Sequence, residues 1–236
     1  MSKTKRDDSL SRYLLPIIIS AAAVIRLFNI GSPSLWYDEL YTVWASRLPV
    51  ATLLQEVPAS RHPPVYYLVA HVWLGLVSGD AWVRLISCMA GVIAVGLVYL
   101  IGKDLFSVRA GIWGAALTAF SPFLIWYSRD ATDYSWLIAV SLGSFYLLVR
   151  SLKKGGSLNW ALYCIVTFVA LFSHYYAVFL FIAEIAFFII ISKHRKQIRP
   201  WLICQEIFLL ALFPLVLLLR RFQSSSYEQY LNYTTP

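Results

Sequence analysis

The chain has 236 residues, of which 59% are hydrophobic and only 14% are charged, and its formal net charge is +8. Because soluble domains carry about 25% charged residues, this composition excludes an ordinary soluble domain and indicates a polytopic membrane protein. The positive charge is interpreted as membrane topology, since Lys and Arg collect in cytoplasmic loops, and not as nucleic-acid binding.

The apolar stretches, in chain order, lie near residues 13–30, 64–79, 82–101, 111–127, 135–150, 159–173, 175–192 and 201–219. A spanning helix needs roughly 20 such residues. The first stretch follows a basic N-terminus and resembles a signal peptide, but no small-residue cleavage site follows it, so it is interpreted as an uncleaved span. The stretch 64–79 begins beside His62-Pro63-Pro64, and Pro is well tolerated at a helix start.

The basic residues decide whether 64–79 crosses the membrane. If it does not cross, the N-terminus and segments 102–110, 150–157 and 193–199 share one face, and every lysine lies on that face. If it crosses, the three later basic segments oppose the basic N-terminus, against the positive-inside rule. We therefore expect an all-α integral membrane protein with about seven transmembrane helices, a cytoplasmic N-terminus, and 64–79 at the outer interface.

The first outer loop, residues 31–80, is expected to carry interfacial juxtamembrane helices. Apolar residues recur at helical spacing within residues 34–57, namely Leu40, Val43, Trp44 and Leu48. Pro49 and Pro58 bound a second short helix. The whole chain, 1–236, is interpreted as one transmembrane module that ends in an outer tail, 222–236.

Two acidic clusters fall on the predicted outer face. Asp38 and Glu39 lie in the first loop, and Asp130 and Asp133 lie in the second. Carboxylates at a membrane surface are costly to dehydrate, so two sets that converge suggest chemistry. The structural alternatives stay open: first-turn acids on a helix dipole for Asp38-Glu39, an ion pair of Asp130 with Arg129, and a helix start at Asp133.

Histidines and arginines accompany these acids on the outer face. His62 and His174 are candidate contacts for a phosphate or a metal, and the alternative for each is a structural helix-start or turn residue. Arg220-Arg221 either anchors a helix end or recognises phosphate through the guanidinium fork. Glu184, well inside a span, is either a functional carboxylate or one satisfied by neighbouring hydroxyls.

The three cysteines, Cys88, Cys164 and Cys204, are widely spaced within apolar stretches. The chain has no CxxC pair. Neither a disulfide framework nor a thiolate zinc site is therefore indicated.

Four motifs follow one another along the chain: Trp36-Tyr37-Asp38-Glu39, His62-Pro63-Pro64-Val65-Tyr66-Tyr67, Trp126-Tyr127-Ser128-Arg129-Asp130 and Ser173-His174-Tyr175-Tyr176. Together they resemble membrane glycosyltransferases of the GT-C class, closest to the family 39-like branch. That branch includes protein O-mannosyltransferases and aminoarabinose transferases that act on lipid A. The resemblance covers nearly the whole chain, but relatives generally carry further spans. The chain is therefore interpreted as their N-terminal module, either a fragment or one part of a split protein with a partner.

The resemblance implies a sugar donor on polyprenyl phosphate, reached from the outer leaflet of the plasma membrane. The acceptor stays open among glycan, lipid and protein. Asp38 would be the catalytic base, and Asp130 or Asp133 would shape the acceptor or metal site. Many relatives read Gln-Glu-Ala-Arg-x-Tyr where this chain reads Asp130-Ala131-Thr132-Asp133-Tyr134 after Arg129. Thr132 thus replaces a family arginine.

The predicted catalytic residues are Asp38, Glu39 and Asp130. The predicted substrate-binding residues are His62, Arg129, Asp133, Tyr134, His174, Arg220 and Arg221, and a divalent metal would be held by Asp38, Asp130 and His62. A carboxylate base would take a proton from the acceptor hydroxyl, cations would stabilise the leaving phosphate, and a single displacement would invert the anomeric centre. The alternatives are a polyprenyl-lipid flippase, which usually carries ionisable residues near the midplane, and a non-catalytic module that binds the lipid-linked sugar.

Overall fold

The computed structural model describes residues 3–60, 62–190 and 196–213. These residues form helices joined by short connections, without a strand in the described ranges. The helices, in chain order, are α1 (Lys3–Leu27), α2 (Tyr37–Arg47), α3 (Val50–Ala59), α4 (Val65–Leu74), α5 (Asp80–Leu105), α6 (Val108–Phe120), α7 (Pro122–Tyr127), α8 (Asp133–Lys154), α9 (Ser157–Leu171), α10 (Ala177–Ile190) and a further helical stretch over residues 198–213.

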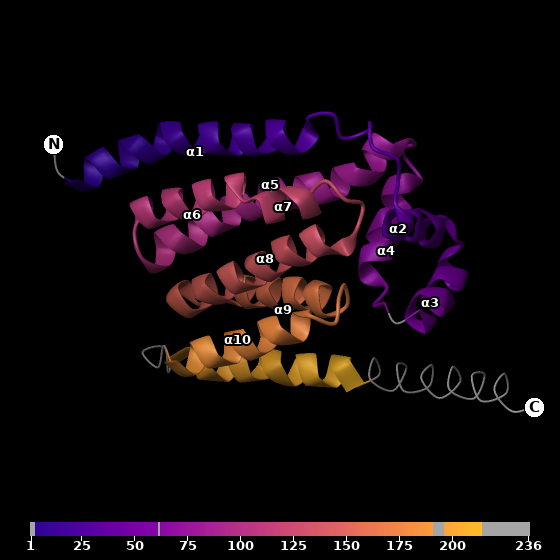
Figure 1. Cartoon of the computed structure of the whole chain (residues 1–236). Coiled ribbons are helices and arrows are strands. Elements are labelled where there is room, and N and C mark those ends of the chain that lie inside the picture. Colours follow the sequence, from indigo (N-terminus) through magenta and orange to yellow (C-terminus); the bar gives the residue numbers. More distant parts are fainter. Residues whose placement is uncertain (1–2, 61, 191–195, 214–236) are drawn as a thin grey trace, which may run out of the picture.

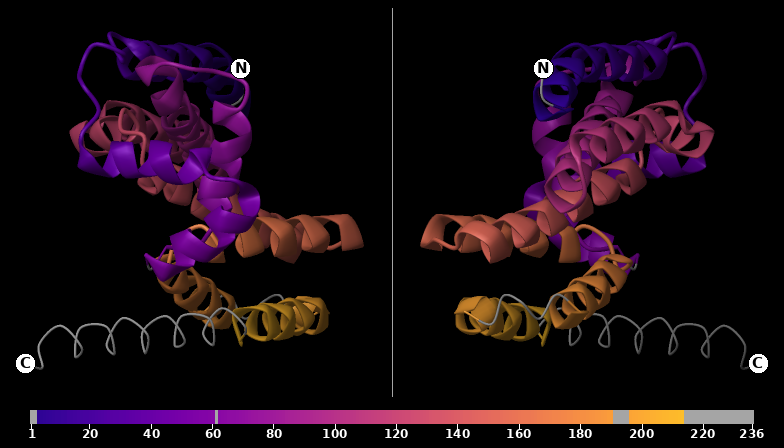
Figure 2. Two further views of the ribbon diagram at one scale, coloured as in Figure 1. Left: turned by 90° about the vertical axis from the view of Figure 1, so that its right-hand side faces the viewer. Right: turned by 90° about the vertical axis from the view of Figure 1, so that its left-hand side faces the viewer.

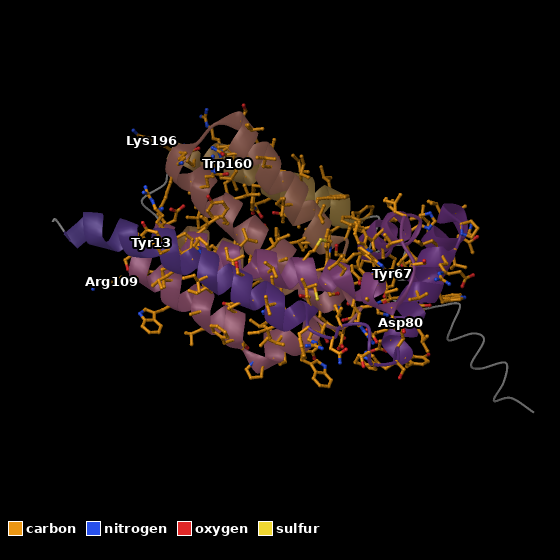
Figure 3. All side chains as sticks on the ribbon, turned by 90° about the horizontal axis from the view of Figure 1, so that it is seen from above. Tyr13, Tyr67, Asp80, Arg109, Trp160 and Lys196 are labelled. Carbon is orange, nitrogen blue, oxygen red and sulfur yellow. The ribbon has the colours of Figure 1, made fainter. Side chains whose placement is uncertain are left out.

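The long helices lie side by side, and the short helices α2, α3 and α4 gather at one end of the bundle (Figure 1). α5 packs against α6 and α8, α8 packs against α9, and α1 packs against α6 and α5. α10 and residues 198–213 form an outer layer, as the two side views of Figure 2 show. Arg109 and Lys196 lie at the end opposite Tyr67 and Asp80 (Figure 3), so these basic residues are separated from the α2–α4 end.

The all-helical prediction is confirmed for the described residues. Two of the described helices, α5 and α8, are long and apolar enough to cross a membrane, with mean hydropathies of 2.3 and 1.5. α4, α6, α9 and α10 are apolar but shorter. The number of seven spans therefore stays a prediction. The expected juxtamembrane helices correspond to α2, α3 and α4, with Pro49 directly before α3. Pro58, which was expected to end this helix, lies inside it, one residue before its last residue, Ala59.

The predicted span 111–127 is divided into α6 and α7 at Pro122. Because Pro122 has no N–H, the carbonyl of Thr118, four residues earlier, loses its helical partner. Arg26 of α1 supplies donors instead: its Nη2 lies 3.3 Å from the Thr118 oxygen and its Nη1 lies 3.0 Å from the Ala119 oxygen. Arg26 is fully buried, so backbone carbonyls solvate this cation and join α1 to α6.

Glu184 of α10 accepts hydrogen bonds from two neighbouring helices. Ser144 Oγ of α8 donates to it over 2.7 Å, and the Tyr163 hydroxyl of α9 donates over 2.9 Å. The side chain is only 1% exposed. Hydroxyl donors stabilise helix association in a membrane, so these contacts favour the structural alternative for Glu184.

α5 and α6 approach each other through small residues. A Cβ atom on Gly102 would lie 2.8 Å from Gly111 Cα, and a Cβ atom on Gly111 would lie 2.5 Å from the backbone oxygen of Tyr99. Small residues let membrane helices pack this closely. The α5–α6 contact thus depends on the absence of a side chain at Gly111.

Replacing Gly111 with Ala should lower the apparent melting temperature, because overpacking a close contact costs about 1–3 kcal/mol. Thermal unfolding of the purified protein in one detergent measures this change. Gly96→Ala is the matched control, since Gly96 lies on α5, the partner helix of Gly111, and a Cβ atom on it meets no atom within 4 Å. Equal melting temperatures for the two variants would contradict the close approach.

Candidate active site

The start of α2 places two neighbouring carboxylates in different surroundings. Trp36 precedes the helix, and its backbone N–H donates to Glu39 Oε2 over 3.2 Å, as in one half of a capping box. Asp38 and Glu39 occupy the first turn, where negative charge is favourable. Successive helical residues point about 100° apart, so these two side chains face different sides.

Glu39 forms a bidentate ion pair with Arg84 of α5. Arg84 Nε lies 2.6 Å from Oε1, and Arg84 Nη2 lies 2.7 Å from Oε2. The backbone N–H of Ala131 also donates to Oε1, over 2.8 Å. Glu39 is 0% exposed and Arg84 is 3% exposed. Both partners of this ion pair are therefore withdrawn from water.

Arg84 also organises the connection between α1 and α2. Its Nη1 donates to the carbonyls of Ile30 and Pro33, each over 2.8 Å, and its Nη2 donates to Ser34 over 3.2 Å. One guanidinium group therefore holds α5, this connection and Glu39 together. A buried cation needs such a full set of acceptors, because an unsatisfied buried charge is costly.

These contacts bear on the predicted catalytic role of Glu39, which stays a prediction. Burial alone raises the pKa of Glu39, but hydrogen bonds from Arg84, Ala131 and Trp36 outweigh that effect and hold the pKa below its usual value. A carboxylate with a lowered pKa and occupied oxygens is a poor proton acceptor. Through these contacts Glu39 holds the turn that carries Asp38. No role was assigned to Arg84 from the sequence. The feature that could have pointed to it is the presence of an arginine near the start of an apolar stretch.

Asp38 lines a polar cavity of ≈ 410 Å³. The cavity is formed by α2, the connection after α3, α4 and the beginning of α8, and its lining residues are Tyr37, Asp38, Tyr41, Thr42, Ser60, His62, Tyr67, Thr132, Asp133 and Tyr134. The structure thus brings together four predicted site residues, namely Asp38, His62, Asp133 and Tyr134. The two acidic loops converge here, although they are far apart in sequence.

Asp133, which lines this cavity, has one side-chain oxygen without a hydrogen-bond partner among the described residues. The residue is 6% exposed, and this oxygen is its Oδ2. Buried polar atoms in native proteins are almost always hydrogen-bonded. An unpartnered buried oxygen of this kind is therefore a candidate for a role in the site.

The two histidines lie near each other and near this cavity. Burial lowers the pKa of His62, and Asp38 offsets part of that change; burial also lowers the pKa of His174, and His62 lowers it further. His174 Nδ1 accepts the backbone N–H of Tyr176 over 3.0 Å, and its ring centre lies 5.7 Å from that of Tyr134. A lowered pKa favours the neutral imidazole, which offers hydrogen bonds and not charge.

Arg129 and Asp130 line a second cavity, of ≈ 520 Å³, which also contacts the buried Glu39–Arg84 pair. Arg129 Nη1 donates to the Ile25 carbonyl of α1 over 3.1 Å. Burial raises the pKa of Asp130, and the charge of Glu39 raises it further. The alternative of an Arg129–Asp130 ion pair is wrong for the described residues, which form no such contact.

The predicted metal ligands are not assembled. Asp130 lines a different cavity from Asp38 and His62, and within the described ranges no three His, Cys, Asp or Glu residues lie close enough to hold a metal ion. Ligand atoms must reach one ion at about 2.0–2.6 Å, so the described residues do not fit the predicted site. Metal dependence stays a prediction. The predicted phosphate contacts Arg220 and Arg221 lie outside the described residues.

An apolar cavity of ≈ 840 Å³ lies on the other side of α4, between α4, α5, α8 and α9. Tyr67 of α4 lines the polar cavity, whereas Leu68, the next residue, lines the apolar one. Ile93 and Val140 contribute walls from α5 and α8. A cavity with such walls suits a hydrocarbon chain.

Comparison with known proteins gives one family match. Residues 61–218 match the family model described as dolichyl-phosphate-mannose-protein mannosyltransferase. Neither the curated proteins nor the solved structures contain a match to this chain. The matched range begins after Asp38 and Glu39, and it includes the second acidic loop and both histidines of the site.

Replacing Glu39 with Gln should destabilise the protein. The change leaves Arg84 buried without its counter-charge, and breaking a buried pair in this way costs about 3–5 kcal/mol. The melting temperature of the purified variant measures the loss. Glu56→Gln is the matched control, because Glu56 is exposed on α3. A Glu39→Gln variant as stable as the control would refute the ion pair's structural role.

The same pair predicts a dependence of stability on pH. Since the pKa of Glu39 is lower in the folded protein, its contribution is complete above the ordinary carboxyl pKa of about 4.3 and is lost as pH falls through the lowered value. The difference in melting temperature between wild type and Glu39→Gln should be constant from pH 7 to pH 5, and it should shrink below about pH 4. A difference that grows on acidification would contradict this assignment.

Proposed function

The chain belongs to the dolichyl-phosphate-mannose-protein mannosyltransferase family, a family of membrane glycosyltransferases, and on that premise we propose that it transfers a sugar from a polyprenyl-phosphate donor to an acceptor hydroxyl or phosphate. The reaction takes place at the outer face of the plasma membrane. The observation that supports this proposal best is the polar cavity in which Asp38 and the unpartnered Asp133 meet. Both acids line a space of ≈ 410 Å³, which is large enough for a sugar-sized group.

Asp38 is the proposed general base. An acceptor hydroxyl must lose its proton as its oxygen attacks the anomeric carbon, and a carboxylate within hydrogen-bond reach can take that proton. Asp38 is only partly buried and lines the cavity, whereas both carboxylate oxygens of the neighbouring Glu39 accept hydrogen bonds from Arg84. Asp133 Oδ2 accepts a hydroxyl of the bound sugar or acceptor and thereby orients it. A single displacement inverts the anomeric centre.

The leaving polyprenyl phosphate gains negative charge, which a cation stabilises. Arg129 is the candidate among the described residues, because it lines the second cavity beside the Glu39–Arg84 pair. The apolar cavity on the other side of α4 takes the polyprenyl chain, since its walls are hydrocarbon. No step of this mechanism uses a metal ion.

The flippase alternative depends on an ionisable group within the membrane interior that is available to a substrate. Glu184 was the residue that fitted that pattern, and Ser144 and Tyr163 satisfy its carboxyl group. The non-catalytic alternative predicts binding of a lipid-linked sugar without turnover. The release of free polyprenyl phosphate, measured as described below, distinguishes this alternative from the proposed transferase. Absence of release from the chain alone would agree with a requirement for a partner chain.

Replacing Asp38 with Asn should abolish transfer while leaving the melting temperature unchanged. Loss of a general base lowers the rate about 10²–10⁴-fold. Release of free polyprenyl phosphate is measured in lipid, with dolichyl-phosphate mannose and other polyprenyl-phosphate sugars as donors and an envelope extract as the acceptor. Asp80→Asn, an exposed acid at the start of α5, is the control. Wild-type turnover by Asp38→Asn would remove Asp38 from the base role.

The proposed orientation makes a separate prediction about labelling. In a background with the three cysteines replaced by Ala, Tyr37→Cys should react with an impermeant maleimide on intact cells, because Tyr37 is 79% exposed at the proposed outer face. Lys154→Cys, at the exposed end of α8, should react only after permeabilisation. The reverse pattern would overturn the orientation.

A further inference from the structure

Two cysteines that are distant in sequence meet between helices. Cys164 of α9 and Cys204 of the helical stretch 198–213 have their Sγ atoms 2.8 Å apart. Both are free thiols, and Cys204 is 3% exposed. Cys88 is engaged elsewhere, since its Sγ contacts the Arg26 carbonyl over 3.3 Å. The sequence gives no sign of this pair, because forty positions separate its members.

The two sulfur atoms are within reach of a covalent bond. A disulfide has a length of about 2.04 Å, so the atoms need to approach by less than about 1 Å. The stretch 198–213 is held against α10 by Trp201, whose ring stacks on Phe188 with centroids 3.9 Å apart and planes inclined by 4°. Trp201 lies one turn before Cys204, so this stacking fixes the helix that carries the thiol.

A cavity of ≈ 420 Å³ opens beside the pair, and its walls include Cys164, Cys204, Trp160 and Gln197. Trp160 and Lys196 lie at the end of the bundle away from Tyr67 (Figure 3), on the opposite side from the Asp38 cavity. A small apolar molecule can therefore approach the thiols without entering the candidate active site.

We propose that Cys164 and Cys204 form a reversible intramolecular disulfide, with a membrane-soluble quinone as the oxidant. Both S–H bonds break, one S–S bond forms, and two electrons with two protons pass to the quinone, which becomes a quinol. A dithiol reverses the reaction by thiol–disulfide exchange. The bond joins α9 to residues 198–213 and closes a loop that contains α10. This inference is independent of the proposed sugar transfer.

Thiol counting on the full chain tests the proposal. Purified protein in lipid nanodiscs is treated with decylubiquinone and denatured, and its thiols are tagged with a polyethylene-glycol maleimide. Wild type, with three cysteines, should fall from three tags to one and recover three after dithiothreitol. Cys88→Ser is the matched control and should fall from two tags to none. Cys164→Ser and Cys204→Ser should each keep two.

Mass spectrometry of the oxidised wild type identifies the cross-linked peptides without relying on a variant's fold. A peptide that joins Cys164 to Cys204 within one chain is the expected product. Three tags after both the quinone and the thiol oxidant diamide would overturn the proposal. A cross-link to Cys88, or a disulfide-linked dimer that accounts for the lost thiols, would overturn it as well. A disulfide that forms with diamide and not with the quinone would rule out the quinone as oxidant.

Discussion

The buried ion pair between Glu39 and Arg84 is the constraint on which the candidate site depends. Arg84 stands in α5, one of the two long apolar helices, and its guanidinium group reaches Glu39 and the connection before α2. Glu39 in turn accepts from Ala131, in the second acidic loop. Two charges withdrawn from water are stable only with such complete pairing. The pair therefore sets where α2 begins, and hence where Asp38 points.

Much of this arrangement follows from sequence patterns. Charge asymmetry between loops predicts which ends of the helices lie together, and Figure 3 shows Arg109 and Lys196 at the end opposite Asp80. The spacing of apolar residues predicts the short helices of the first loop, and the acidic loops do meet around Asp38 and Asp133. Helical periodicity and the cost of burying charge depend on neighbouring residues in the sequence, so these features can be predicted without coordinates.

Other features depend on contacts that no local pattern reveals. Asp38 and Glu39 are adjacent acids with the same propensities, and only the position of Arg84 separates a cavity-lining carboxylate from a structural one. Asp130 lines a different cavity from Asp38, so the described residues do not bring the three predicted metal ligands together. The meeting of Cys164 with Cys204 likewise depends on how two helices pack.

The central claim is that the two adjacent carboxylates have separate roles: Asp38 acts as the general base, and Glu39 forms the structural ion pair with Arg84. Turnover per folded molecule, measured for Glu39→Gln alongside Asp38→Asn, tests that division most directly. Folded Glu39→Gln should keep more of its polyprenyl-phosphate release than folded Asp38→Asn, which should lose about 10²–10⁴-fold. A Glu39→Gln variant that keeps wild-type stability but loses turnover, beside an active Asp38→Asn, would show that the roles are reversed.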